Sequence, residues 1–120
     1  MTTKRELIKQ YKQTPPEMGI FQIKNKINGK IFIGRAMNLP GIINSNKFQL
    51  KMKSHYIKEL QEDYNKHGES NFEFEKLDTL KHKEDVNVNH SDELETLEQM
   101  WLEKLQPYGE KGYNTKTDRL

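Results

Sequence analysis

Two short apolar segments joined at Asn28-Gly29 limit the folds open to this chain of 120 residues. The segments over residues 18–24 and 30–35 contain aromatic and β-branched residues, which favour strands. Asn-Gly is typical of tight hairpin turns, because such turns need a positive φ that glycine adopts at no steric cost. The sequence therefore predicts an antiparallel β-hairpin near the start of the domain.

An alternating segment further along the chain predicts a third strand. Residues 71–77 alternate between apolar and polar, which is typical of a strand with one buried face. A charged loop is expected over residues 81–90. Residues 4–12 favour a short helix, which the two prolines after Thr14 end, because proline cannot continue a helix.

Two helices are expected between the second and third strands. The Asn-Leu-Pro-Gly sequence of residues 38–41 is typical of a turn, and a helix is expected to begin near Lys47. Ser54 is the expected N-terminal cap of the next helix, because its hydroxyl can accept from a free backbone N–H. Gly68 is expected to stop that helix.

A last helix is expected to begin at Ser91, as its cap, and to run to about Leu105. The element order is then strand, strand, helices, strand, helix. This order is typical of an α+β domain, with a small three-stranded antiparallel sheet flanked by helices. We expect residues 1–17 to form an N-terminal arm, residues 18–116 a single domain and residues 117–120 a tail.

The composition excludes several classes of protein. The chain has no cysteine, which excludes a disulfide framework and a thiolate zinc site. No apolar stretch approaches the roughly 20 residues that a membrane-spanning helix needs, and the first residues lack the apolar run of a signal peptide. We therefore expect a cytoplasmic protein with no membrane partner; the sequence does not specify its oligomeric state.

The charge is distributed unevenly along the chain. Residues 1–60 contain twelve Lys or Arg and three Asp or Glu, whereas residues 61–120 contain eight and fifteen. Between Glu17 and Glu59 there is no acidic residue, and the basic residues of that stretch are Lys24, Lys26, Lys30, Arg35, Lys47, Lys51, Lys53 and Lys58. The stretch is consistent with a phosphate-binding surface. It is equally consistent with a solvated surface that the acidic half balances after folding.

Glu98 falls inside the apolar stripe of the last predicted helix. Leu94, Leu97, Trp101 and Leu105 recur at helical spacing, and Glu98 lies among them. A carboxylate on that side must be paired, hydrogen-bonded or metal-bound, unless it reaches solvent. Glu98 is therefore either a candidate metal ligand or a glutamate at the boundary of the core.

Short motifs occur in a fixed order over residues 18–114. They are Gly19-Ile20-Phe21, Phe32-Ile33-Gly34, Tyr64-Asn65-Lys66-His67-Gly68, Glu98-Gln99-Met100-Trp101 and Gly112-Tyr113-Asn114. Together they resemble the motifs of the GIY-YIG nuclease family: the paired hairpin signature, a recurrent helix ending, a glutamate on a late helix and an asparagine in the tail. The element order predicted above is similar to that family's.

The resemblance implies a nucleic-acid partner, DNA above all, and metal-assisted phosphodiester hydrolysis. It assigns catalytic positions to Phe21, Phe32, Glu98 and Asn114, with a single Mg²⁺ or Mn²⁺ at Glu98. In the family, a motif tyrosine helps to activate the attacking water. An arginine on the first helix stabilises the charge that develops on the phosphate.

The chain departs from this pattern at both tyrosines and at the arginine. Phe21 and Phe32 occupy the tyrosine positions, and a phenyl ring can pack but cannot accept a proton or hydrogen-bond a water. Both rings are also expected to serve the hairpin core. By spacing, the arginine position falls near Ile42. The candidate phosphate-binding residues that remain are Arg35, Lys47, Lys51, Lys53 and His55, the last with an ordinary surface histidine as its alternative.

Three functions remain open from the sequence. The first is a GIY-YIG-like domain that binds nucleic acid, with metal-dependent cleavage weak or lost. The second is an active magnesium-dependent endonuclease that uses a replacement base, such as Lys47. The third is a non-enzymatic regulatory or protein-interaction domain, since a fold alone does not fix a function.

Overall fold

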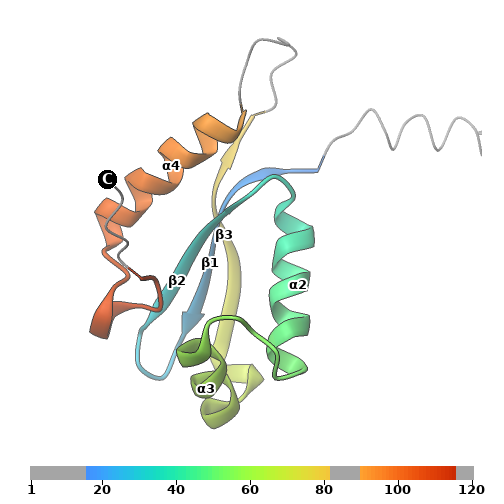
Figure 1. Ribbon diagram of the computed structural model, residues 1–120, viewed down its shortest axis with the longest axis vertical. Coiled ribbons are helices and arrows are strands. Elements are labelled where there is room, and N and C mark those ends of the chain that lie inside the picture. The colour runs from blue at the N-terminus through green and yellow to red at the C-terminus, as the bar shows by residue number, and fades with distance from the viewer. Residues whose placement is uncertain (1–15, 82–89, 116–120) are drawn as a thin grey trace, which may run out of the picture.

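A three-stranded antiparallel sheet forms the centre of the domain in this computed structural model, which describes residues 16–81 and 90–115. The strands are β1 (Met18–Asn25), β2 (Ile31–Ala36) and β3 (Phe72–Leu80). β1 lies in the middle and pairs with β2 on one side and β3 on the other. The predicted α+β class with a small antiparallel sheet is confirmed (Figure 1).

Helices cover both faces of this sheet. Helices α2 (Leu39–Lys51) and α3 (Lys58–His67) follow β2, and helix α4 (His90–Leu105) follows β3. In Figure 1, α2 and α4 lie on opposite sides of the sheet. The sheet therefore has no face fully open to solvent, which explains why β1 is buried over its first six residues.

The alternation of side chains along β1 supplies both of these interfaces. Phe21 and Ile23 belong to the main apolar cluster, together with residues of α2 and α3. Ile20 precedes Phe21 and points to the opposite face of the strand. It is fully buried but lies outside that cluster, on the face that α4 covers. The burial of its first six residues suits β1 to the central position, and the buried Gln22 on the same face as Ile20 is satisfied because its Nε2 donates to Oε1 of Glu75 at 2.7 Å.

The predicted hairpin is confirmed, with a four-residue loop instead of a two-residue turn. The Asn25 N–H donates to the Lys30 carbonyl at 2.9 Å, and the Gly29 N–H donates to the Asn25 carbonyl at 2.8 Å. Gly29 has a φ of 80°, which favours glycine. The Asn28 side chain accepts from the Lys30 N–H at 2.9 Å, so each residue of the Asn-Gly pair has its own part in the loop.

The two hairpin motifs lie opposite each other across the strands. Phe21 pairs with Gly34, and Ile23 pairs with Phe32. A Cβ atom at position 34 would lie 2.7 Å from the Phe21 ring, closer than packed atoms approach. Gly34 is therefore required because the Phe21 side chain covers its backbone, and the two motifs depend on each other.

Helix α2 begins earlier than the sequence predicted. It starts at Leu39, not near Lys47, and the predicted turn at residues 38–41 is wrong. Asn38 caps the helix, since its Oδ1 accepts from the Gly41 N–H at 3.0 Å. Asparagine and proline are common both in turns and at helix N-termini, so this sequence was compatible with either structure.

The cap predicted for helix α3 is also wrong. Ser54 lies before the helix, and its hydroxyl donates to the Gln49 carbonyl at 3.3 Å. The cap residue is Ile57, whose N–H donates to Nδ1 of His55 at 3.1 Å. Gly68, with a φ of 87°, ends the helix as predicted.

The remaining predictions have mixed outcomes. The third strand is confirmed and extends to Leu80. Helix α4 ends at Leu105 as predicted but begins at His90, so Ser91 lies inside it and is not its cap. The predicted helix over residues 4–12 and most of the predicted loop over 81–90 lie outside the described residues. Within the described ranges, no helix is long and apolar enough to cross a membrane.

Replacing Gly34 with alanine is expected to destabilise the domain. The added methyl group meets the Phe21 ring at 2.7 Å, and overpacking of this kind costs about 1–3 kcal/mol. Urea denaturation followed by circular dichroism measures the change. The same substitution in a Phe21→Leu background should cost less, because the ring is then absent. An equal cost in both backgrounds would contradict the assigned contact.

Candidate active site

A cleft of about 430 Å³ lies beside the edge strand β2. Its lining comes from β1, β2, α2, α4, the loop before α3 and the tail after α4. The lining residues are Phe21, Phe32, Ile33, Gly34, Arg35, Ile42, Asn46, Gln49, Tyr56, Glu98 and Asn114. The structure thus brings together all four residues that the sequence assigned to catalytic positions, although they span most of the chain.

Apolar side chains form the wall where the family pattern requires polar groups. The rings of Phe21 and Phe32 meet edge to face, with centroids 5.9 Å apart and an interplanar angle of 67°. Ile42 lies on the same cleft, at the position that spacing assigned to the family's arginine. This part of the wall can pack against a ligand, but it can neither transfer a proton nor supply a charge.

Glu98 is ion-paired with Arg35. The carboxylate Oε1 lies 2.8 Å from Nη1 of the guanidinium. The Glu98 side chain is 16% exposed and the Arg35 side chain 37%, so the glutamate is the more enclosed partner. Glu98 thus fits the predicted glutamate at the boundary of the core, with its charge compensated by a residue 63 positions away in the sequence. Its assignment as a metal ligand stays a prediction.

A divalent ion at Glu98 does not fit the side chains as they are arranged. One carboxylate can hold Mg²⁺ that keeps most of its water, so the number of ligands alone does not decide the question. The deciding feature is that Arg35 already binds the Glu98 carboxylate, and its positive charge opposes a second cation there. Among the described residues, no group of three or more His, Asp or Glu side chains gathers elsewhere as a metal site.

Asn114 uses its whole side-chain amide to hold the tail against β2. Its Oδ1 accepts from the Ile33 N–H at 2.9 Å, and its Nδ2 donates to the Ile33 carbonyl at 2.8 Å. The carboxamide thus takes the hydrogen bonds that a further strand would take. Its placement indicates a positioning function in the cleft wall.

Tyr113 fastens the tail from the other side. Its hydroxyl donates to Oδ2 of Asp63 at 2.6 Å and accepts from Nδ2 of Asn25 at 3.0 Å. Burial, followed by the hydrogen bond to Asp63, raises the pKa of the Tyr113 hydroxyl. The tail therefore joins the hairpin and α3 through a buried polar network.

His55 is buried, so the prediction of an ordinary surface histidine is wrong. Its Nε2 lies 2.6 Å from Oδ1 of Asn46, and its Nδ1 accepts from the Ile57 N–H. Since Nδ1 accepts, the ring proton is on Nε2 and is donated to Asn46. Both ring nitrogens are used within the protein, which leaves no free donor for a phosphate; burial also lowers the pKa of His55.

Tyr56 is a cleft residue that sequence reasoning missed. Its ring stacks on His55, with centroids 4.7 Å apart, and meets the edge of Phe32 at 6.5 Å. Although it is well exposed, its phenol pKa is raised by partial burial and then by the negative charge of Glu98. It brings an aromatic hydroxyl into a cleft whose strand positions carry phenylalanine. The signal in the sequence that could have indicated Tyr56 was its position directly after His55.

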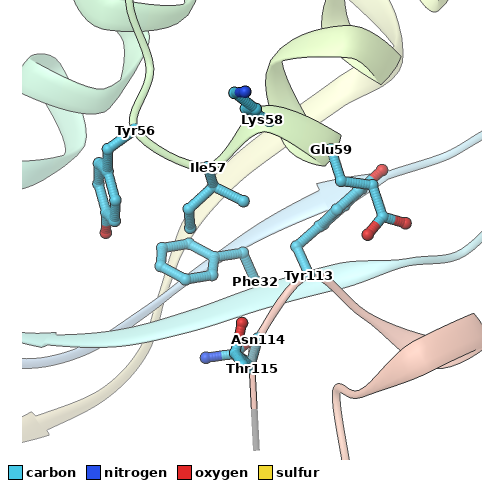
Figure 2. A pocket seen from close by; sticks show the side chains of 8 residues that line it. All are labelled: Phe32, Tyr56, Ile57, Lys58, Glu59, Tyr113, Asn114 and Thr115. Atoms are coloured by element: carbon cyan, nitrogen blue, oxygen red, sulfur yellow. The ribbon is translucent and has the colours of Figure 1, made fainter.

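A second hollow of about 520 Å³ adjoins the cleft and shares Phe32, Tyr56 and Asn114 with it. Figure 2 shows the rings of Tyr56, Phe32 and Tyr113 around this hollow, with Asn114 on the tail below Phe32. The Lys58 amine points away from the other side chains in the view. The two hollows therefore adjoin through shared residues, and the aromatic rings of Phe21, Phe32, Tyr56 and Tyr113 lie along them.

The structure does not bring the candidate lysines to the cleft. Lys47 lies over the Phe74 ring, with Nζ 5.3 Å from the centroid, and Lys51 and Lys53 follow at the end of α2. None of them lines either hollow. Of the five phosphate-binding candidates, Arg35 lines the cleft and His55 packs behind Tyr56.

Part of the basic stretch is balanced by acidic residues after folding. Lys30 is paired with Glu59, and Nζ of Lys26 lies 4.0 Å from Glu73. Within the described ranges, the basic residues of the stretch that have no ion pair are Lys24, Lys47, Lys51, Lys53 and Lys58. The balanced-surface interpretation therefore fits the paired residues of the stretch, and phosphate binding by the unpaired ones stays a prediction.

Known proteins resemble this chain in fold and sequence. The catalytic domain of the homing endonuclease I-TevI superposes with a TM-score of 0.67 at 28% identity, covering 83% of this chain and 99% of that domain. A variant of the same domain, with glutamate replaced by alanine, superposes with a TM-score of 0.66 at 28% identity, over 82% of this chain and 92% of the other. These likenesses in fold and sequence support membership of the GIY-YIG family.

A curated relative supports the same assignment. The chain is 29% identical over 87 residues to intron-associated endonuclease 1 of Enterobacteria phage T4. The match covers 72% of this chain and 32% of the phage protein, so the chain spans about a third of that relative's length. No family model matches the chain. The comparisons thus support a nuclease-like domain, and the chain departs from the family pattern at the positions described above.

The stability of the domain is expected to fall as the pH is lowered through the range of His55. Burial holds the pKa of His55 below its ordinary value of about 6.5. Below pH 6.5 the unfolded chain therefore takes up a proton that the folded chain does not, and unfolding becomes more favourable. Urea denaturation at about pH 7.5 and about pH 5.5 measures the loss.

The matched control for this pH dependence is a second histidine at the end of α3. The loss should be smaller in His55→Gln, whereas His67→Gln should keep it. If His55→Gln and the unmodified protein lost the same stability between the two pH values, His55 would not be its source.

Proposed function

We propose that this domain binds nucleic acid, DNA above all, in the cleft beside β2, with metal-dependent phosphodiester cleavage weak or lost. One observation carries the proposal: the cleft is assembled at the family's motif positions, but its proton-transfer and cationic positions are Phe21, Phe32 and Ile42. The site keeps the shape of a nuclease cleft and has changed its chemistry.

Charge and exposure support the binding half of the proposal. Arg35 is part-exposed at the cleft, Lys58 lines the adjoining hollow, and the other unpaired lysines of the basic stretch add positive charge elsewhere on the domain. Such charges attract a polyanion over distances of about 10 Å at moderate salt. Exposed aromatic rings such as Tyr56 add surfaces on which bases stack. The relatives described above are named as endonucleases, which makes DNA the first ligand to test.

The absence of a tyrosine base and of the helix arginine supports the proposal that cleavage is weak. Removing a general base typically lowers a rate by about 10²–10⁴-fold, and removing a preorganised cation costs a further large factor. Phe21 and Phe32 cannot replace the base, because a phenyl ring has no ionisable proton. Ile42 cannot replace the arginine for the same reason, as its side chain carries no charge.

We expect the purified protein to bind duplex DNA at low salt and to nick supercoiled plasmid weakly or not at all. Fluorescence anisotropy should show an affinity that falls steeply as salt rises, because phosphate contacts release counterions. Plasmid incubated with Mg²⁺ or Mn²⁺ should stay largely supercoiled, with the same residual nicking in Glu98→Ala.

Two outcomes would contradict this proposal. Efficient metal-dependent nicking that Glu98→Ala abolishes would restore the active-endonuclease function. No DNA binding at low salt would remove the nucleic-acid ligand and leave the protein-interaction function.

The position of Tyr56 favours residual cleavage as a second candidate function. Its hydroxyl is the aromatic hydroxyl that lines the cleft, with Phe32 at its edge and Glu98 near enough to raise its pKa. A raised pKa keeps the phenol protonated at neutral pH, so it would hold an attacking water by hydrogen bonding and would not take its proton. Lys47, the replacement base considered from the sequence, lies away from the cleft.

Any residual nicking should therefore depend on the Tyr56 hydroxyl. Tyr56→Phe keeps the ring and its stacking on His55, and it should lower nicking by about tenfold or more while leaving DNA affinity within about twofold. Tyr64→Phe removes the hydroxyl of another tyrosine that does not line the cleft, and serves as the control. Equal nicking by all three proteins would reject this second candidate.

A further inference from the structure

We propose that Arg35 takes the place of a divalent cation on Glu98, so that the group this cleft offers to a phosphate is a guanidinium. The inference deepens the proposed function and rests on it for the identity of the ligand. In the protein without bound DNA, Arg35 keeps metal ions away from Glu98.

The ion pair presents its positive side to the cleft. Glu98 is the more enclosed partner, with 16% of its side chain exposed against 37% for Arg35. Arg35 and Glu98 are also the two charged residues of the cleft lining. An anion that enters the cleft therefore meets the guanidinium, with the carboxylate behind it.

The guanidinium keeps most of its hydrogen-bonding capacity. Arginine carries five N–H donors, and the bond from Nη1 to Glu98 at 2.8 Å is the hydrogen bond that Arg35 makes within the described part of the chain. The remaining donors form the planar fork that suits phosphate oxygens. Arg35 can thus bind a phosphate while Glu98 continues to hold it in position.

A metal ion must compete with this arrangement. To bind Glu98, a divalent ion must displace the guanidinium or lie beside it against like charge. Part of the surrounding wall is apolar, since Phe21, Phe32 and Ile42 line the same cleft, and apolar side chains do little to screen such repulsion. Among the described residues, no other carboxylate lines this cleft to offset the repulsion, so the arginine is favoured over the metal.

Mn²⁺ binding tests the claim about the empty protein without any DNA. Electron paramagnetic resonance measures free Mn²⁺, whose signal falls when the ion binds a protein. The unmodified protein should leave the signal unchanged, Arg35→Gln should reduce it, and Arg35→Gln/Glu98→Gln should restore it. Mn²⁺ binding by the unmodified protein that Glu98→Gln abolishes would overturn the proposal, as would no gain of binding in a folded Arg35→Gln protein.

DNA affinity tests the phosphate contact. The unmodified protein should bind duplex DNA equally in Mg²⁺ and in EDTA, and Arg35→Gln should weaken binding by about tenfold, the scale of one charge-assisted hydrogen bond. Arg35→Lys should fall between the two, because it keeps the charge without the fork. Thermal melting of each variant shows that it is folded.

Lys76→Gln is the matched control for the DNA measurements. Lys76 is also ion-paired, with Nζ 2.7 Å from Oε1 of Glu17, but it lies on β3 outside the cleft. Its removal changes the net charge equally and should weaken binding by about twofold at most. Equal losses for Arg35→Gln and Lys76→Gln, or DNA binding that requires Mg²⁺, would overturn the proposal. A protein that binds no DNA would instead overturn the proposed function, and the Mn²⁺ result would still decide the claim about Glu98.

Discussion

The pairing of β1 with β2 in a single register is the constraint on which the rest of this domain depends. Phe21 opposite Gly34 and Ile23 opposite Phe32 place two aromatic rings on one face of the hairpin. A shift of one residue would turn them to the other face and expose the apolar set. Helix α2, the cleft wall and the contact with Tyr56 all use that face, so the register positions the site as well as the core.

Local pattern predicted the sheet better than it predicted the helices. The hairpin carries strand-forming residues and an Asn-Gly turn, and β3 carries two-residue periodicity; neighbouring residues alone can specify both patterns. The start of α2 was missed, because Asn38 and Pro40 suit a turn and a helix N-terminus equally, and the packing of Leu39 into the core decides between them. The Arg35–Glu98 pair was not predictable from either residue, since their contact depends on how α4 docks against β2.

The candidate site shows that several motif residues have structural contacts of their own. Asn114 is retained, and its carboxamide is fully used in holding the tail to β2. Gly34 is retained, and the Phe21 ring covers it whether or not that ring carries a hydroxyl. Residues with packing or hydrogen-bonding contacts thus occupy their motif positions, whereas Phe21, Phe32 and Ile42 stand where the family pattern has phenol and arginine groups. Resemblance over the motifs is for this reason stronger support for architecture than for catalysis.

The docking of the tail along β2 also bears on how this protein behaves at high concentration. An open edge strand presents free N–H and carbonyl groups that can pair with another chain and lead to aggregation. Here Ile31 pairs with Gly112, and the backbone of Ile33 bonds to the Asn114 side chain, so one edge of the sheet is already occupied. The other edge, β3, carries the charged residues Glu73, Glu75 and Lys76. Strand addition is therefore blocked by the tail at the β2 edge and disfavoured by charged side chains at the β3 edge.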